Sequence, residues 1–260
     1  MALLLKKKLK AGKSVLGTML CMIDNPNIVW LLKGIGFDFV FIDCEHGTYT
    51  VQAVSNIVTV ARAVGLGTIV RIPQPDRPSI QKYADMGIDG IMLPMVETTK
   101  QIELANQFSR YKPLGSRGIS LGATVDWKGG VDVGETIREL NDDFIILAQI
   151  ESRAGVENID QIMSVPGVDG CFFGVYDMSI SYDKPGEIYD PIFRQNIKIV
   201  LDSAKRHNKI LGHHFFGYQD LEWGMEQGVK FITWHTDTSA LQKAYADDVK
   251  KIKSMPLFVR

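Results

Sequence analysis

The sequence has few cysteines, no long apolar run and no excess of charge of either sign. Its 260 residues include three cysteines, Cys21, Cys44 and Cys171. Three widely spaced cysteines do not make a disulfide framework or a zinc cluster, so they predict reduced thiols in a cytoplasmic protein. No apolar run approaches the roughly 20 residues that span a bilayer, and no signal-peptide pattern opens the chain. We therefore expect no membrane association.

The balance of charge excludes one further class of partner. The formal net charge is −1, with 29 basic and 30 acidic residues. A chain so close to neutral offers no electrostatic reason to bind nucleic acid. The sequence also lacks a G-x-G-x-x-G motif after its first apolar run, which disfavours an open dinucleotide-binding sheet.

A local pattern recurs four times along the chain. Each copy has a glycine where a helix would end, then a hydrophobic residue, a polar residue and a short apolar run. The four copies are GFDFVFI from Gly36, GIDGIML from Gly87, GVDGCFF from Gly167 and GVKFITW from Gly228. Glycine in the left-handed conformation ends a helix, and the run after it is typical of a strand buried on both faces.

Other apolar runs fit between these copies and complete a regular alternation. They are SVLGTML (14–20), GTIVRI (67–72), FIILAQI (144–150) and KILGHHF (209–215). Segments with apolar residues three or four apart lie between the eight predicted strands, which indicates helices. Eight strands alternating with helices over residues 1–260 predict one (β/α)₈ TIM barrel in a single domain.

One segment departs from the short loops of such a barrel. Residues 114–130, LGSRGISLGATVDWKGG, are rich in glycine and show no clear period. A long loop in a compact domain is usually functional or disordered. Because it follows the fourth predicted strand, we expect it on the side where the active site forms.

Polar residues collect at the carboxyl ends of the predicted strands, where the active sites of barrel enzymes lie. They are Asp43, Glu45 and His46 after strand 2, Arg71 in strand 3, Gln149 and Glu151 after strand 5, Asp177 after strand 6, His213 and His214 in strand 7, and Trp234, His235 and Asp237 after strand 8. No lysine stands at these ends, which disfavours Schiff-base chemistry.

Several of these residues also have purely structural interpretations. Glu151 could cap the helix that begins near Ser152, and Asp177 could form a turn. Adjacent residues of a strand point to opposite faces, so at most one of His213 and His214 faces the barrel interior. A metal site built from that pair is therefore disfavoured.

Taken together, the residues favour enolate chemistry on a small acid. Glu151 and Asp177 are oxygen ligands that suit Mg²⁺ or Mn²⁺. Arg71 offers a rigid fork for an anionic substrate oxygen, and His46 near Asp43 offers a base. A metal, an arginine and an imidazole around one opening would stabilise an enolate formed from a 2-oxo acid.

The chain resembles the HpcH/HpaI family of metal-dependent 2-oxo-acid aldolases, whose type member cleaves 4-hydroxy-2-oxoheptanedioate. The resemblance runs from about Gly17 to Leu241. It rests on FDFVFIDCEHG, VRIP, LPMV (93–96), GSRG (115–118), QIESR (149–153) and GVDGCFFGVYDMS, in that order.

The resemblance implies a role for each matching residue. Glu151 and Asp177 would bind the metal, for which Co²⁺ is a further alternative to Mg²⁺ and Mn²⁺. His46 would be the base, oriented by Asp43, and Arg71 would bind the enolate oxygen. Gln149 and Glu45 would lie around a metal-bound water, and the backbone N–H groups of Tyr176 and Asp177 would hold the substrate carboxylate. A homo-oligomer, commonly a hexamer, is also implied.

The chain departs from the family at the rim that meets the aldehyde. The family usually has a small residue where this chain has Tyr176, and a tryptophan in place of Met19. His213, His214, Trp234 and His235 replace residues that are mostly small or aliphatic. We include His214 among the predicted substrate-binding residues.

The predicted reaction is therefore aldol cleavage or formation of a 4-hydroxy-2-oxo acid, giving pyruvate and an aldehyde through a metal-stabilised pyruvate enolate. A CoA-ester lyase of the citrate lyase type and an oxaloacetate-like decarboxylase are alternatives that use the same enolate. A barrel that binds a small acid without turnover is the non-enzymatic alternative. The sequence leaves open the aldehyde, the direction and the native metal.

Overall fold

The computed structural model describes residues 4–258, which form one closed barrel of eight parallel strands. The strands are β1 (Val15–Leu20), β2 (Phe39–Asp43), β3 (Gly67–Arg71), β4 (Gly90–Leu93), β5 (Ile145–Ile150), β6 (Gly170–Phe173), β7 (Ile210–Phe215) and β8 (Phe231–Thr236). They pair in chain order, and β8 closes on β1. All eight predicted strands and the (β/α)₈ fold are confirmed.

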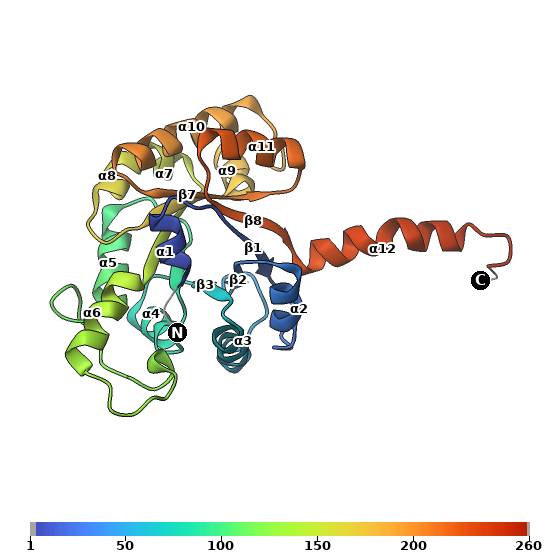
Figure 1. Ribbon diagram of the computed structural model, residues 1–260. Coiled ribbons are helices and arrows are strands. Elements are labelled where there is room, and N and C mark those ends of the chain that lie inside the picture. The colour runs from blue at the N-terminus through green and yellow to red at the C-terminus, as the bar shows by residue number, and fades with distance from the viewer. Residues whose placement is uncertain (1–3, 259–260) are drawn as a thin grey trace.

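Helices surround the barrel and connect its strands (Figure 1). They are α1 (Leu4–Lys10), α2 (Ile28–Ile35), α3 (Val51–Val64), α4 (Arg77–Ala84), α5 (Thr99–Ser109), the 3₁₀ turn η1 (Ala123–Val125), α6 (Val133–Asp143), α7 (Arg153–Glu157), α8 (Ile159–Ser164), α9 (Val175–Ser181), α10 (Pro191–Arg206), α11 (Tyr218–Gln227) and α12 (Asp237–Lys253). Gly36 and Gly228 end α2 and α11 with φ of 109° and 103°, as the recurring glycine pattern predicts. In the described residues, no helix is both long and apolar enough to cross a membrane.

The barrel interior is filled by large aromatic side chains. Phe39, Phe41, Phe172 and Phe231 point inward, and the ring centroids of Phe39 and Phe231 lie 4.3 Å apart. Burying one such ring contributes about 1.5–3 kcal/mol. Gly17 leaves the necessary room, because a Cβ there would lie 2.5 Å from the Phe39 ring. The interior is therefore a packed floor beneath the carboxyl ends of the strands, and not a channel.

The amino-terminal end of the barrel is closed by α1. Leu5 and Leu9 of this helix pack against the interior cluster. Lys6 Nζ reaches the backbone oxygen of Phe144 and the carboxylate of Asp169, each at 2.7 Å. Access to the barrel interior is thus restricted to the opposite end.

The long loop at 114–130 lies at the amino-terminal end of the barrel, and the expectation that it borders the active site is wrong. Helix α5 follows β4 and carries the chain back to that end before the loop begins. The Arg62 side chain donates hydrogen bonds to the backbone oxygens of Gly87, just before β4, and of Thr124 in the loop. It also pairs with Asp126 at 2.7 Å. The loop therefore packs beneath the barrel.

Helix α12 extends away from the barrel, at the red end of the chain in Figure 1. Leu241, Tyr245, Val249 and Ile252 are all exposed on it, each being 44% or more accessible to solvent. Their spacing of four, four and three residues places them on one face of the helix. This exposed apolar stripe has no partner among the described residues of the chain.

Candidate active site

A layer of polar side chains stands on the aromatic floor. The last inward-facing residues of β2, β3, β5 and β7 are Asp43, Arg71, Gln149 and His214. Side chains of a strand alternate between its two faces, so residues two positions apart point the same way. Each of these four residues therefore points inward directly above an inward-facing position of the floor on the same strand. The apolar run FVFI therefore ends in acidic residues because β2 emerges there at the carboxyl mouth of the barrel.

Arg71 is held by a carboxylate on the neighbouring strand. Its Nε and Nη2 donate to Asp43 Oδ1 and Oδ2 at 2.9 and 2.7 Å. Both residues are buried, with 7% and 2% of their surface exposed. Burial opposes ionisation of Asp43, but the hydrogen bonds and charge of Arg71 outweigh it and lower the pKa of the carboxyl. The guanidinium is thus fixed in orientation and remains charged.

Two further side chains contact the same guanidinium. Arg71 Nη1 lies 3.4 Å from Gln149 Oε1, and Arg71 Nε lies 3.3 Å from Glu45 Oε2. A guanidinium has five N–H donors. These contacts leave one N–H on Nη1 and one on Nη2 for a ligand.

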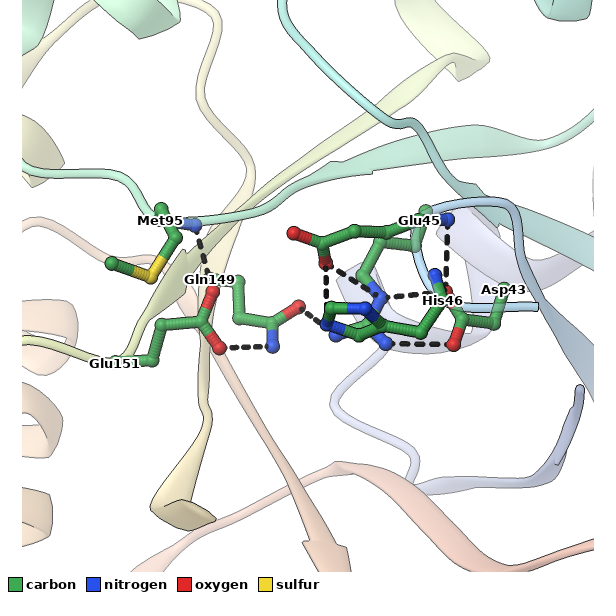
Figure 2. A network of polar contacts seen from close by, with 7 residues as sticks. Asp43, Glu45, His46, Met95, Gln149 and Glu151 are labelled. Carbon is green, nitrogen blue, oxygen red and sulfur yellow. Dashed lines mark hydrogen bonds and ion pairs between the residues drawn. The ribbon is translucent and has the colours of Figure 1, made fainter. Parts of the chain in front are cut away.

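His46 lies on the loop after β2, at the rim of the site. Its backbone N–H donates to Asp43 Oδ1 at 3.3 Å, while its imidazole is 67% exposed. His46 Nε2 is 3.8 Å from Glu45 Oε2, and Figure 2 shows this carboxylate above the ring. The predicted orientation of the imidazole by Asp43 is not what the structure shows. Asp43 positions the backbone of His46, and Glu45 is the carboxylate beside the ring.

Glu151 is a buried carboxylate with amide partners. Its Oε1 accepts the backbone N–H of Met95 at 2.7 Å, and its Oε2 accepts from the Gln149 side chain (Figure 2). Burial, together with the nearby charge of Asp177, raises the pKa of Glu151 to about 7. Glu151 does not cap the next helix, because the Ser152 side chain accepts the N–H of Gly155 and caps α7.

Asp177 lies in the first turn of α9, on the other side of Glu151. No hydrogen bond or ion pair reaches its side chain from the residues that the structure describes. Gly174, at the start of this helix, is in contact with Glu151, because a Cβ at Gly174 would lie 2.5 Å from Glu151 Oε2. The segment from β6 into α9 is therefore packed directly against the acidic side chain of β5.

These residues line one cavity of about 290 Å³ at the carboxyl mouth. The lining residues are Met19, His46, Arg71, Gln149, Glu151, Phe172, Phe173, Gly174, Val175, Tyr176, Asp177, His213, His214, Phe216 and Thr236. The structure thus brings together the predicted residues His46, Arg71, Gln149, Glu151, Tyr176, Asp177 and His214. Asp43 lies behind Arg71, and neither Glu45 nor His235 lines the cavity. Trp234 and Asp237 do not line this cavity.

The donor set fits a divalent cation. Within residues 4–258, no group of three or more His, Cys, Asp or Glu side chains could hold a metal ion. Hard cations such as Mg²⁺ commonly use one or two protein carboxylates and complete their shell with water and substrate oxygens. Glu151 and Asp177 face the same space, and a buried carboxylate with a raised pKa is stabilised by a nearby cation.

The two histidines of β7 lie on opposite faces of the strand, as predicted. His213 Nδ1 donates to the backbone oxygen of Phe173 at 2.9 Å, and its ring packs edge-on against Phe215. His214 turns inward, where its Nδ1 lies 2.8 Å from Thr233 Oγ1 on β8. Burial lowers the pKa of His213 to about 4 and that of His214 to about 3, so both rings are neutral near pH 7.

Sequence reasoning missed two contributors to this site, Met95 and Phe216. Met95 has a φ of 47°, a left-handed conformation, and its N–H points at Glu151. Phe216 packs edge-on against both Tyr176 and His214, with ring centroids 5.6 and 4.5 Å apart. Met95 lies in LPMV, which gives no sign of a left-handed residue, and Phe216 lies one residue beyond the predicted strand.

A family model described as HpcH/HpaI aldolase/citrate lyase matches residues 18–244. The chain is 35% identical over 178 residues to a hydroxypyruvate/pyruvate aldolase from Deinococcus radiodurans, a match that covers 68% of this chain and 63% of that relative. It is 30% identical to a 5-keto-4-deoxy-D-glucarate aldolase from Klebsiella pneumoniae, over 89% of this chain and 91% of the relative.

The solved structures include one that is closely similar. The crystal structure of an HpcH/HpaI aldolase from Desulfitobacterium hafniense superposes with a TM-score of 0.95 at 37% identity. That similarity covers 98% of this chain and 99% of the other. The match extends over the barrel, the polar layer and the segments that carry the site residues.

Proposed function

The chain belongs to the HpcH/HpaI aldolase/citrate lyase family, and from this premise we propose that it is a divalent-metal-dependent pyruvate aldolase. It would cleave or form a 4-hydroxy-2-oxo acid, with pyruvate and an aldehyde as the two fragments. One observation carries the proposal. Glu151, just after β5, and Asp177, in the first turn of α9, line the same cavity as Arg71, and His46 stands at its rim.

Glu151 and Asp177 would hold the cation, with Mg²⁺, Mn²⁺ and Co²⁺ as the candidate ions. When bound, such an ion supplies Lewis-acid polarisation of the substrate carbonyl. The backbone N–H groups of Tyr176 and Asp177 support binding of the substrate carboxylate. They stand in the first turn of α9, before the first intrahelical donor, Met178 N, and so have no intrahelical acceptor.

Arg71 and His46 would divide the remaining chemistry. In the cleavage direction, His46 takes the proton of the C4 hydroxyl and the C3–C4 bond breaks. The electron pair of that bond becomes the pyruvate enolate, and the other fragment leaves as an aldehyde. The two free N–H groups of Arg71 would stabilise the enolate oxygen. Asp43 supports this role, because it fixes the guanidinium that must meet the charge.

The exposed stripe on α12 supports a further proposal, that the protein is a homo-oligomer. An apolar face of this kind on a helix that extends from the barrel is suited to contact with another copy of the chain. The three free cysteines support the prediction of a reducing, cytoplasmic environment.

Exchange of the methyl protons of pyruvate in D₂O tests the proposal without knowledge of the aldehyde. With Mn²⁺ present, NMR should show loss of the methyl signal at a rate that depends on the protein. Glu151→Ala should lose both Mn²⁺ binding and exchange. Full exchange after removal of the metal would contradict the metal-dependent mechanism. Absence of exchange with metal bound would favour a barrel that binds a small acid without turnover.

A further inference from the structure

His214 stands across the barrel from Arg71. His214 is the last inward-facing residue of β7, and Arg71 is the last inward-facing residue of β3. In a closed ring of eight strands, β3 and β7 lie opposite each other. Both side chains line the cavity, and His214 is 9% exposed. The proposed pyruvate site lies on the β3, β5 and β6 side. His214 therefore faces the part of the cavity that the second substrate would occupy.

The partner of His214 determines which ring nitrogen carries the proton. Thr233 is completely buried, and within the described chain its hydroxyl has one hydrogen-bond partner, His214 Nδ1 at 2.8 Å. A buried hydroxyl proton without an acceptor is costly. The Thr233 hydroxyl therefore donates its proton in a hydrogen bond to His214 Nδ1, which accepts it. In a neutral imidazole this leaves the proton on Nε2.

Nε2 of His214 is a donor without an acceptor. No hydrogen bond reaches it from residues 4–258, although the side chain is buried and lines the cavity. The ring is also held from the side by Phe216, whose centroid lies 4.5 Å away. A fixed N–H that points into a cavity and has no protein partner is suited to a ligand oxygen.

Apart from Arg71, the described lining of the cavity offers no Lys or Arg side chain that could pair with a carboxylate on this ligand. Arg71 is the one positively charged side chain among its described lining residues, and Asp43 and Glu45 already pair with it. The wall beside His214 consists of Phe216 and Tyr176, which are aromatic and uncharged. A carboxylate on the second substrate would therefore lose its hydration without gaining an ion pair.

We propose that His214 Nε2–H binds the carbonyl oxygen of the acceptor aldehyde, and that this site selects uncharged aldehydes over those that carry a carboxylate. The inference rests on the proposed pyruvate aldolase function and names its second substrate class. It also makes His214 a catalytic residue, because its hydrogen bond strengthens as charge develops on that oxygen.

The addition step forms one carbon–carbon bond and returns one proton to the product. The methylene carbon of the pyruvate enolate forms a bond to the aldehyde carbon, and the carbonyl π pair moves to the aldehyde oxygen. His214 Nε2–H donates a hydrogen bond to this alkoxide and keeps its proton. The proton removed earlier from the pyruvate methyl group returns to the alkoxide and gives the C4 hydroxyl.

Two half-reactions measured on the same variants test the inference. The first is pyruvate exchange in D₂O with Mn²⁺, which needs no aldehyde. The second is aldol addition of pyruvate to butyraldehyde and to succinic semialdehyde, two four-carbon aldehydes of which only the second carries a carboxylate. The variants are His214→Leu, which removes the donor, and His214→Gln, which can restore an N–H. Thr233→Val removes the partner that fixes the ring.

We expect wild-type protein to prefer butyraldehyde in kcat/KM. His214→Leu should lower kcat/KM for butyraldehyde by about 10²-fold, as loss of one donor to a developing oxyanion does, while exchange stays near the wild-type rate. His214→Gln should recover part of the addition rate. The kcat/KM of Thr233→Val for butyraldehyde should lie between the values of wild-type protein and of His214→Leu. Retained exchange also shows that each variant is folded.

Each contrary result has a distinct meaning. Wild-type exchange without any preference for butyraldehyde would overturn the assigned substrate class. Undiminished addition by His214→Leu would overturn the role of His214 and leave the proposed function standing. Loss of exchange in both His214 variants would place the residue in the enolate half-reaction and overturn the inference. Absence of exchange in wild-type protein would instead remove the proposed function, and with it this inference.

Discussion

The guanidinium of Arg71 and the carboxylate of Asp43 are joined by two hydrogen bonds inside the barrel, Nε to Oδ1 at 2.9 Å and Nη2 to Oδ2 at 2.7 Å. The two residues are 28 positions apart in the sequence and directly paired in register between β2 and β3. The pair gives Arg71 one orientation, and that orientation determines which of its N–H groups face the cavity.

Loss of Asp43 should lower the stability of the folded chain. Asp43→Ala removes both hydrogen bonds that hold the buried Arg71 and leaves it the half-buried Glu45 alone, so we expect a loss of about 3 kcal/mol in the free energy of unfolding. Urea denaturation measures this loss. The control is Asp202→Ala, which breaks the exposed ion pair with Lys198 and should have much less effect. Equal losses in the two variants would contradict the buried pair as a source of stability.

Loss of His46 should separate catalysis from metal binding. Because His46 lies at the exposed rim and contacts neither Glu151 nor Asp177 among the contacts described, His46→Ala should bind Mn²⁺ as wild type does. Removal of a general base should lower kcat by about 10²–10⁴-fold. Steady-state kinetics and Mn²⁺ titration followed by electron paramagnetic resonance measure the two quantities. Wild-type turnover would exclude His46 as the base.

A methyl group at residue 174 should disturb Glu151 without straining the backbone. Gly174 has a φ of −101°, which any residue adopts, but its Cβ would lie 2.5 Å from Glu151 Oε2. Gly174→Ala should therefore weaken Mn²⁺ binding and lower activity. The control is Gly34→Ala in α2, where the new Cβ meets nothing within 4 Å. That change should add up to about 1 kcal/mol of stability and leave activity unchanged. Equal Mn²⁺ affinity in both variants would contradict the packing of Gly174 against Glu151.

The neutral histidines of β7 should contribute a stability that is lost in acid. Burial lowers the pKa of His213 to about 4 and that of His214 to about 3, from 6.5. At these two residues the unfolded chain therefore binds up to two protons more than the folded chain between pH 6.5 and about 4. The contribution of each histidine to stability should fall as the pH falls through this window, by about 1.4 kcal/mol per pH unit, while Glu151 and Asp89, whose pKa values are raised to about 7 and about 6, contribute with the opposite sign.

Urea unfolding at pH 7 and at pH 5 tests this dependence. His214→Gln should abolish the proton that residue 214 takes up on unfolding, and so reduce the slope of stability against pH. This holds whatever the substitution does to stability at pH 7. An unchanged slope in that variant would contradict a neutral His214.

The apolar stripe on α12 should form the interface of the proposed homo-oligomer. Tyr245→Lys with Val249→Lys places two charges on the stripe and should lower the molar mass in sedimentation velocity. Asp247 lies between them in sequence but faces a different side of the helix, so Asp247→Lys should keep the wild-type mass. An unchanged mass in the double variant would exclude this face as the interface.

The barrel was predictable because its signal is local and repeated. Glycine at Gly36 and Gly228 ends a helix and the apolar run that follows must be buried, so each unit identifies its own strand. Chemistry at the carboxyl ends of the strands then follows from the fold. This is why Arg71, Glu151 and Asp177 could be assigned to one site although they are far apart in the chain.

The predictions about the carboxylate beside His46 and about the position of residues 114–130 failed because they depended on a backbone conformation that no short motif encodes. The contact beside His46 comes from Glu45 because the loop after β2 turns the Asp43 side chain toward Arg71. The side of the barrel on which residues 114–130 lie depends on whether a helix precedes them, and the polar sequence of α5 shows little periodicity. The left-handed Met95 is set by its neighbours in space.

The division of the site between strands and connecting segments has a consequence for its evolution. Arg71, Gln149 and His214 project from strands locked into the closed sheet, whereas Tyr176 and Phe216 come from the segments that follow β6 and β7. Substitutions in those segments can change the shape of the cavity mouth without breaking a hydrogen bond between strands of the barrel. Substitutions that accumulate there during evolution can therefore change which aldehyde the proposed site prefers, while the strand residues that serve the carbon–carbon bond chemistry stay unchanged.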